Sequence, residues 1–258
     1  PISAGKDFTV WVVLLLSLLA EPPRFADAQS VSVNVSGQTL VLDAGSSRLV
    51  RLSVDGIRTD STGGFGSRQN AFRRPTDVDA THGLRVLVAD PENSRLVWLD
   101  RHLQAEADIP TAPYRIHRLA VNRSGDVFGI DRDAGRLIKY RLDGSLDTTF
   151  PDIRIDPSLG ADVAVFGDDV LLASGAVLRI LNRFGAQTGF RRFEADILRL
   201  ASGTDRLAVS TAAEVILLDA RYQETTRSGA VADVRDIALL PNRLILLDAN
   251  GIHLRKLD

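Results

Sequence analysis

The sequence contains no cysteine and no methionine, and only three of its 258 residues are lysines. Without cysteine the chain forms no disulfide, holds no thiolate-bound metal or iron–sulfur cluster, attaches no haem covalently and has no thiolate nucleophile. The stability of the folded chain must therefore come from its packed core alone.

An excess of charge of either sign is also missing: 31 Lys and Arg balance 33 Asp and Glu, for a formal net charge of −2. This balance gives no overall attraction to nucleic acid or to anionic lipid. We attribute the preference for arginine over lysine first to codon usage and second to anion recognition. Apolar residues at 45% and charged residues at 25% are typical of a globular chain, long enough for one large all-β domain or two ordinary domains.

Residues 1–28 differ from residues 29–258. Lys6 precedes an apolar run over residues 8–20, which is followed by two prolines and by Ala26, Asp27 and Ala28. This layout is typical of a secretory signal peptide that is cleaved after Ala28. A helix over residues 8–20 would span about 20 Å, less than the roughly 30 Å of hydrocarbon in a bilayer.

The chain starts with proline and contains no methionine, as after removal of an initiator. We therefore expect the apolar segment to be retained as an N-terminal helix that anchors the protein in a bacterial inner membrane, with residues 29–258 in the periplasm. The anchoring side chains would be Phe8, Trp11, Leu14, Leu15, Leu16, Leu18 and Leu19. The alternative is a secreted or periplasmic protein that begins at Gln29.

A repeat of about forty residues runs through the rest of the chain. Three windows share an apolar run that ends in Asp, a short polar turn, and an Arg five residues later that opens a second apolar run. The pairs are Asp43 and Arg48, Asp90 and Arg95, and Asp131 and Arg136. Three later windows keep the spacing with Ser174, Ser210 and Asp248 at the Asp position. Six units of short strands and turns, with no sustained helical period, predict an all-β, six-bladed β-propeller.

These windows resemble NHL repeats, and "PTDVDATHGLRVLVADPENSRLVWLD" is the best match, with Pro75 opening the innermost strand. The resemblance is specific in the first three units and weak in the last three. It implies a six-bladed propeller and a binding platform more often than an enzyme. The last unit ends after three strands, so we expect residues 24–29 to add its outer strand and to close the ring.

The Asp and Arg of each pair bracket a turn between two antiparallel strands. We expect the guanidinium to bind that carboxylate or one in the adjacent blade, and so to stabilise the turn. The alternative is a ring of arginines that binds an anion. We favour the structural role because the pair recurs with the repeat.

No pattern in the sequence indicates catalysis or metal binding. The four histidines, His82, His102, His117 and His253, fall at different positions of their units, and no paired metal-ligand motif is present. Serine, threonine and histidine are too scattered to suggest a triad. We therefore expect no catalytic residue, no metal and no cofactor, although some NHL-like propellers are metal-dependent lyases.

Two basic stretches are candidate contacts for a partner. One carries Arg68, Arg73 and Arg74; the other carries Phe190, Arg191, Arg192 and Arg199. Arginines next to aromatic residues bind RNA in some NHL propellers, but export argues against nucleic acid here. Protein subunits of a membrane complex are the expected partners.

The function that we expect is a non-catalytic, membrane-anchored propeller that serves as an accessory or scaffold subunit of a membrane protein complex, such as a photosynthetic or respiratory one. Two alternatives stay open. One is an exported propeller enzyme, a metal-dependent hydrolase or lyase. The other is a soluble module that binds a ligand or a glycan.

Overall fold

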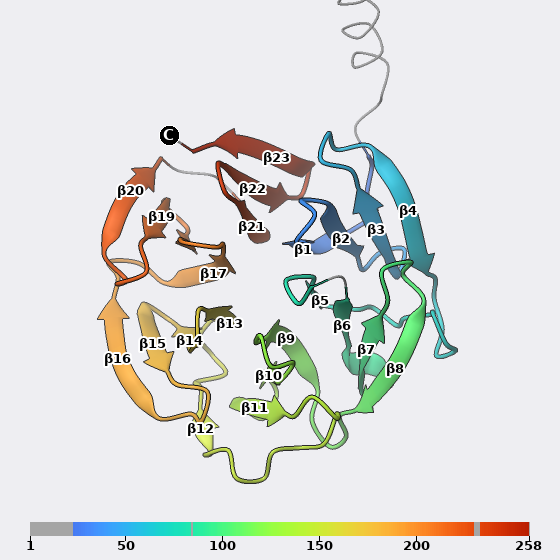
Figure 1. Cartoon of the computed structure of the whole chain (residues 1–258), viewed down its shortest axis with the longest axis horizontal. Helices are drawn as coiled ribbons and strands as arrows, with labels where there is room; N and C mark the ends of the chain where they lie inside the picture. Colours follow the sequence, from blue (N-terminus) through green and yellow to red (C-terminus); the bar gives the residue numbers. More distant parts are fainter. Residues whose placement is uncertain (1–22, 84, 230–232, 258) are drawn as a thin grey trace, which may run out of the picture.

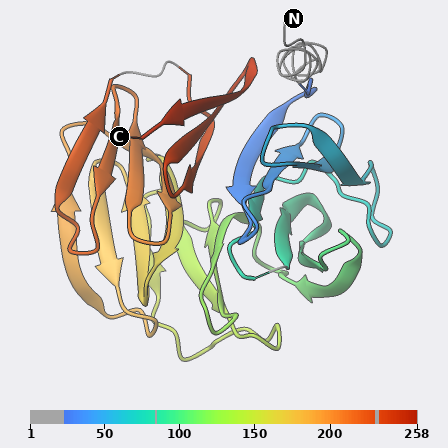
Figure 2. The ribbon, with the colours of Figure 1, turned by 45° about the horizontal axis from the view of Figure 1, so that its top comes forward.

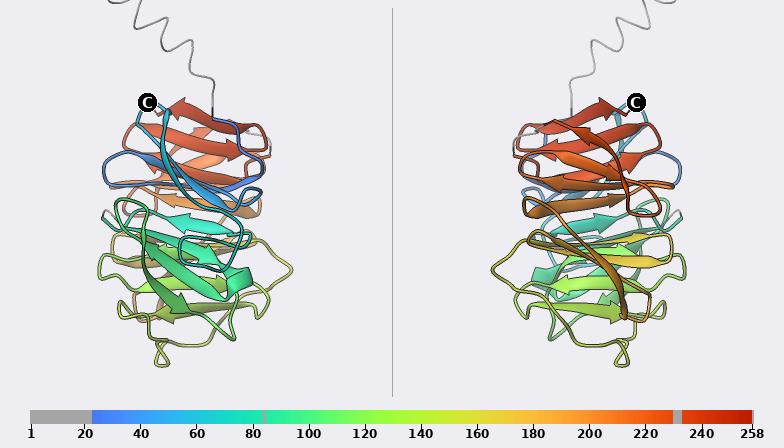
Figure 3. Two further views of the ribbon diagram at one scale, coloured as in Figure 1. Left: turned by 90° about the vertical axis from the view of Figure 1, so that its right-hand side faces the viewer. Right: turned by 90° about the vertical axis from the view of Figure 1, so that its left-hand side faces the viewer.

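A computed structural model describes residues 23–83, 85–229 and 233–257. These residues form six antiparallel sheets arranged around a central axis, as the sequence predicts (Figure 1). The strands run along the axis between the two faces of the disc (Figure 3). Within each blade the chain moves outward strand by strand, from the axis to the rim.

The first three blades each contain four strands. Blade one is β1 (Ala28–Val33), β2 (Thr39–Asp43), β3 (Arg48–Leu52) and β4 (Arg58–Gly63); blade two is β5 (Asp77–Asp79), β6 (Val86–Asp90), β7 (Arg95–Leu99) and β8 (Ala105–Pro110); blade three is β9 (Ile116–Val121), β10 (Val127–Asp131), β11 (Arg136–Tyr140) and β12 (Ile153–Arg154). The only helical element among the described residues is the 3-10 turn η1 (Pro91–Asn93). None of these residues forms a helix of the length and apolarity needed to cross a membrane.

The last three blades complete the ring. Blade four is β13 (Ala161–Phe166), β14 (Asp169–Ser174), β15 (Val177–Leu181) and β16 (Gln187–Arg192); blade five is β17 (Ile197–Ser202), β18 (Leu207–Thr211), β19 (Val215–Leu218) and β20 (Glu224–Ser228); blade six is β21 (Asp236–Leu240), β22 (Arg243–Asp248) and β23 (Gly251–Lys256). The predicted N-terminal helix and its anchoring side chains lie outside the described residues.

The core consists of six apolar layers, one between each pair of neighbouring blades. In β6, for example, Val86 and Val88 pack toward blade one, whereas Leu87 and Ala89 pack toward blade three. Successive side chains of a strand point to opposite faces of the sheet, and here both faces are buried. This is why the middle strands appear in the sequence as continuous apolar runs rather than as alternating ones.

The ring closes differently from our expectation. Residues 24–29 do not extend blade six: the amides of Ala26 and Asp27 donate to the Asp43 carboxylate of blade one, and β1 is the innermost strand of that blade. Blade six therefore has three strands in the described part of the chain. The first and last blades lie next to each other (Figures 1 and 2) and share an apolar layer that includes Val31 and Ile245.

One face of the disc carries the turns that follow the second strand of each blade and the loops that lead into the next innermost strand. On this face the amides of Gly64 and Arg74 donate to Ser47, and the amide of Ala44 donates to Asp27. We call it the loop face and define it by residues 43–48, 64–76 and 90–95. The chain enters blade one on this face, beside Asp43.

Candidate functional site

The six innermost strands share one polar position near the axis. The strands read QSVSV, TDVDA, HRLAV, ADVAV, LRLAS and RDIAL, and the second residue of each is polar or charged and is followed by Val, Leu or Ile. In blade order these residues are Ser30, Asp77, Arg118, Asp162, Arg199 and Asp236. We call this set the axial ring. Its charges alternate in sign from blade two to blade six, and the uncharged Ser30 occupies the position in blade one.

The carboxylates of the axial ring bind backbone groups that the sheets leave unpaired. An innermost strand is the edge of its sheet, so alternate amides point away from its own blade. Asp77 Oδ2 accepts from Leu119 N, Asp162 Oδ2 from Leu200 N, and Asp236 Oδ2 from Val31 N, each at 2.8 Å. Each aspartate thus joins its blade to the next blade around the ring.

Arg118 lies between two of the aspartates, and Arg199 lies beside the third. Arg118 Nη1 lies 3.2 Å from Asp77 Oδ1, and its Nε lies 4.0 Å from Asp162 Oδ1. Arg199 Nε lies 3.7 Å from Asp236 Oδ1. On the other side of Asp77, the Ser30 hydroxyl donates to Oδ1 at 2.7 Å. Arg199 and Asp162 also attract each other electrostatically, so the five charges interact around the axis.

The three aspartates of the axial ring are buried, at only 5–6% exposure. Burial raises the pKa of Asp162 to about 7, although Arg118 and Arg199 act in the opposite direction. Burial also raises the pKa of Asp236. Burial lowers the pKa of Arg118, but Asp77, Asp162 and Asp236 together raise it by more, so the net shift is upward. With three carboxylates and two guanidiniums, the ring has one surplus carboxylate, and Asp162 is a residue that would hold a proton near neutral pH.

A second polar layer lies next to the ring along the axis. Asp79 accepts from the amide of Val121 in blade three and from Thr81, and burial raises the pKa of this carboxyl. The equivalent positions of the other blades carry small residues: Ser32, Ala120, Ala164, Ala201 and Ala238. These side chains leave room for a cavity at the axis.

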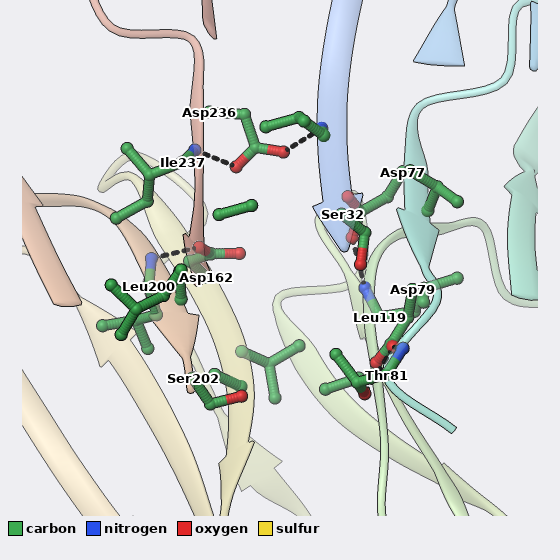
Figure 4. Close-up of a pocket in the computed structure, with 18 of the residues that line it drawn as sticks. Ser32, Asp77, Asp79, Thr81, Leu119, Asp162, Leu200, Ser202, Asp236 and Ile237 are labelled. Atoms are coloured by element: carbon green, nitrogen blue, oxygen red, sulfur yellow. Dashed lines mark hydrogen bonds between the residues drawn. The ribbon is translucent and has the colours of Figure 1, made fainter. Parts of the chain in front are cut away.

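The axial cavity has a volume of about 80 Å³ and is lined by Asp77, Asp79, Asp162 and Asp236 among others (Figure 4). Ligand pockets for small organic molecules usually measure about 300–1,000 Å³. This cavity is the right size for a few water molecules. Among the described residues, no group of three or more His, Asp or Glu side chains is arranged to hold a metal ion.

The Asp–Arg pairs of the repeat occupy the loop face. Asp90 is fully buried, and Arg95 Nε binds its Oδ2 at 3.1 Å. Arg95 also binds Asp108 and donates to the carbonyls of Arg68 and Ala71. In blade two the pair therefore stabilises both its own turn and the long loop from blade one.

The other two pairs differ from the expected arrangement, because in the described residues no ion pair joins Arg48 to Asp43 or Arg136 to Asp131. Asp43 accepts from Ala26 N, Asp27 N and Ser46 Oγ. Asp131 accepts from Arg115 N, Asp133 N and Ala134 N. Arg48 is exposed, and Arg136 lies 3.7 Å from Asp152.

A shared role explains why the Asp position recurs. Asp43 binds the amides of Ala26 and Asp27, Asp90 binds the amide of Arg73, and Asp131 binds the amide of Arg115. Each of these amides lies just before the innermost strand of the same blade. Backbone amides therefore donate hydrogen bonds to all three carboxylates. The arginine of the pair binds the carboxylate only in blade two, where it also holds the long loop from blade one.

The three arginines of the first predicted contact region lie together on the loop face. Arg68, Arg73 and Arg74 are exposed in the loop that connects blades one and two. The Arg73 guanidinium stacks over Phe65 at 5.6 Å, and Phe65 itself is 73% exposed. This loop presents a surface of arginine and aromatic side chains to solvent.

The second predicted contact region is divided by the fold. Phe190 and Arg192 are exposed on β16 at the rim, and Arg191 donates to Tyr222 O and lies 3.4 Å from Glu224 of blade five. Arg199 belongs to the axial ring and not to this surface. The sequence grouping failed here because one strand ends and the next innermost strand begins between Arg192 and Arg199. Aligning the six innermost strands would have revealed the ring.

The sequence matches no protein-family profile and no curated protein. Solved structures with the same fold include hydrazine synthase from Kuenenia stuttgartiensis, with a TM-score of 0.64 and 11% identity over 89% of this chain and 83% of that one. Virginiamycin B lyase from Staphylococcus aureus gives 0.64 and 9% over 92% and 83%. PorZ, a surface component of the type-IX secretion system of Porphyromonas gingivalis, gives 0.62 and 14% over 95% of this chain but 32% of that one. At these identities the similarity shows the propeller fold alone.

Proposed function

We propose that the protein is a non-catalytic propeller that acts as an accessory or scaffold subunit of a membrane protein complex. The observation that carries this proposal is how the charged side chains at the propeller axis are bound. There the carboxylates and guanidiniums bind one another and the edge amides of neighbouring blades. Side chains committed to holding blades together are poorly suited to bind and turn over a substrate.

The size of the axial cavity supports this choice over an exported hydrolase or lyase. A cavity of about 80 Å³ is too small for the substrates of most such enzymes. The neighbours with the same fold include a synthase, a lyase and a surface component of a secretion system, so the fold itself does not decide between the alternatives.

We propose further that residues 8–20 tether the propeller to the periplasmic side of an inner membrane, and that blades one to three are NHL-type. The described chain begins on the loop face, where Ala26 and Asp27 bind Asp43. A tether at this point would hold the loop face toward the membrane and its proteins. The exposed Arg68, Arg73 and Arg74 would then face the partner, and tethering would raise the effective concentration so that a modest contact suffices.

Site-specific photo-crosslinking in the membranes of the organism tests this proposal. A photoreactive amino acid at Arg68 or Arg73 should cross-link to a membrane protein, with the same product from both positions. Val35 and Val54 are matched controls, because both are exposed in turns on the opposite face of the disc. These positions should give several-fold less product.

Equal yields from the two faces, or products with soluble proteins alone, would contradict the proposed orientation. Absence of any product from all four positions would contradict the scaffold function itself.

A further inference from the structure

Blade six presents an incomplete sheet. In the other five blades most residues of the third strand are buried, and a fourth strand pairs with its whole length or, in blade three, with Arg136 and Leu137. The third strand of blade six, β23, is not covered by any described residue, and none of its six residues is fully buried. Leu254 at its centre is 53% exposed.

The hydrogen-bond register shows which backbone groups of β23 are open. The amide of Leu257 donates to the carbonyl of Asn242, so these two residues form a hydrogen-bonded pair. Because hydrogen-bonded and non-bonded pairs alternate in an antiparallel ladder, His253 and Arg255 direct their backbone groups toward β22. Ile252, Leu254 and Lys256 direct theirs outward. No described residue forms a hydrogen bond with these outward groups.

The side chains around this edge indicate the chemistry of its occupant. Strand β23 carries Arg255 and Lys256 and no carboxylate, and Arg243 lies across from Lys256 in the ladder. The nearby carboxylate of Asp248 is bound by His253 at 2.9 Å. Ile252 and Leu254 add apolar surface at alternate positions. A complementary strand would therefore combine acidic and apolar side chains.

We propose that the β23 edge receives an extended, acidic segment of a partner protein as the fourth strand of blade six. The proposal rests on the proposed scaffold function and names the kind of partner segment. Strand addition to an exposed sheet edge is a general mode of peptide recognition, in which main-chain hydrogen bonds give affinity and alternate side chains give specificity. A second copy of this chain is a poorer occupant, because its β23 offers no carboxylate to the basic side chains of the first. Antiparallel pairing of the two strands about Leu254 would place Arg255 of each copy opposite His253 of the other.

Residue-resolved hydrogen exchange of the full chain in mild detergent tests the proposal. The probe is the synthetic peptide EVTVEVTVE. Without the peptide, the amides of Ile252, Leu254 and Lys256 should exchange at least about tenfold faster than those of His253 and Arg255. Saturating peptide should remove this difference. The same peptide with methylated backbone nitrogens, or with lysine in place of glutamate, should leave the difference unchanged.

Two variants separate strand pairing from side-chain contact. Leu254→Pro removes a backbone N–H that points outward and leaves the hydrogen bonds between β23 and β22 in place. It should weaken peptide binding at least about tenfold. Leu254→Thr also removes the leucine side chain but keeps the amide, and should bind within about threefold of the unmodified chain. Thermal unfolding of both variants checks that the blade is intact, and the exchange pattern decides the question if Leu254→Pro does not fold.

Three results would overturn the proposal. The first is protection of Ile252, Leu254 and Lys256 before peptide is added, which would mean that another segment of the chain or a second copy already covers the edge. The second is an exchange pattern that the peptide does not change. The third is equal binding by Leu254→Pro and Leu254→Thr. Each of these leaves the scaffold function standing, because the cross-linking test probes the loop face and not this edge.

Discussion

Arg118→Met is expected to lower the free energy of unfolding by about 3–5 kcal/mol at pH 7.5, as is usual when one partner of a buried ion pair is removed. The guanidinium lies between Asp77 and Asp162, which are buried in neighbouring blades. Without it, both carboxylates would have to remain charged without this partner or take up protons. Urea unfolding followed by circular dichroism measures the loss.

The loss of unfolding free energy in Arg118→Met should become smaller as the pH falls, because protonated carboxyls carry no charge for the guanidinium to balance. Asp77→Asn in the Arg118→Met background should restore part of the stability. Arg115→Met is the matched control, since Arg115 is half-exposed and pairs with the exposed Asp133 at 3.4 Å; it should cost less than about 1 kcal/mol. A loss of similar size for Arg118→Met would show that the axial ring does not hold the blades together.

The contribution of Asp162 to the stability of the protein should fall as the pH rises between about 4 and 7. Burial raises the pKa of Asp162 from 3.8 to about 7 in the folded chain. Between these values the folded chain binds a proton that the unfolded chain has released, so raising the pH favours unfolding. The full contribution is roughly 2–4 kcal/mol, and it levels off above the folded pKa.

Asp162→Asn should remove this contribution, because its amide does not titrate, while its side-chain oxygen still accepts from Leu200 N. The difference in unfolding free energy between variant and unmodified chain should therefore move in favour of the variant from pH 4.5 to pH 8. Asp55→Asn in an exposed turn is the control, and its difference should stay constant. A constant difference for Asp162→Asn as well would mean that this carboxyl stays charged throughout the range.

The repeat predicted the blades because turn chemistry is local. Asp43, Asp90 and Asp131 each bind amides at the start of their own blade, so the residue recurs with the fold even where the arginine partner does not. In the last three blades this position carries Ser174, Ser210 and Asp248, and the strand pattern alone locates those blades.

The sequence pattern did not predict the axial ring, because its members are far apart in the chain. Asp162 and Arg199 lie 37 residues apart in the chain and interact electrostatically only when six strands converge on one axis. Each appears in the sequence as an ordinary charge within a strand. The predicted ring closure was wrong because the amides of residues 26 and 27 bind Asp43 of blade one and not the edge of blade six. Long-range pairing of this kind leaves no local pattern.

The proposal that the propeller is a subunit of a membrane complex can be examined on the native protein. Membranes of the organism would be solubilised in mild detergent, the particles separated by size, and the N-terminus of the chain determined by mass spectrometry. We expect a chain that retains residues 8–20 and migrates in a particle much larger than one copy. A chain that begins at Gln29 and migrates as a single soluble copy would contradict it.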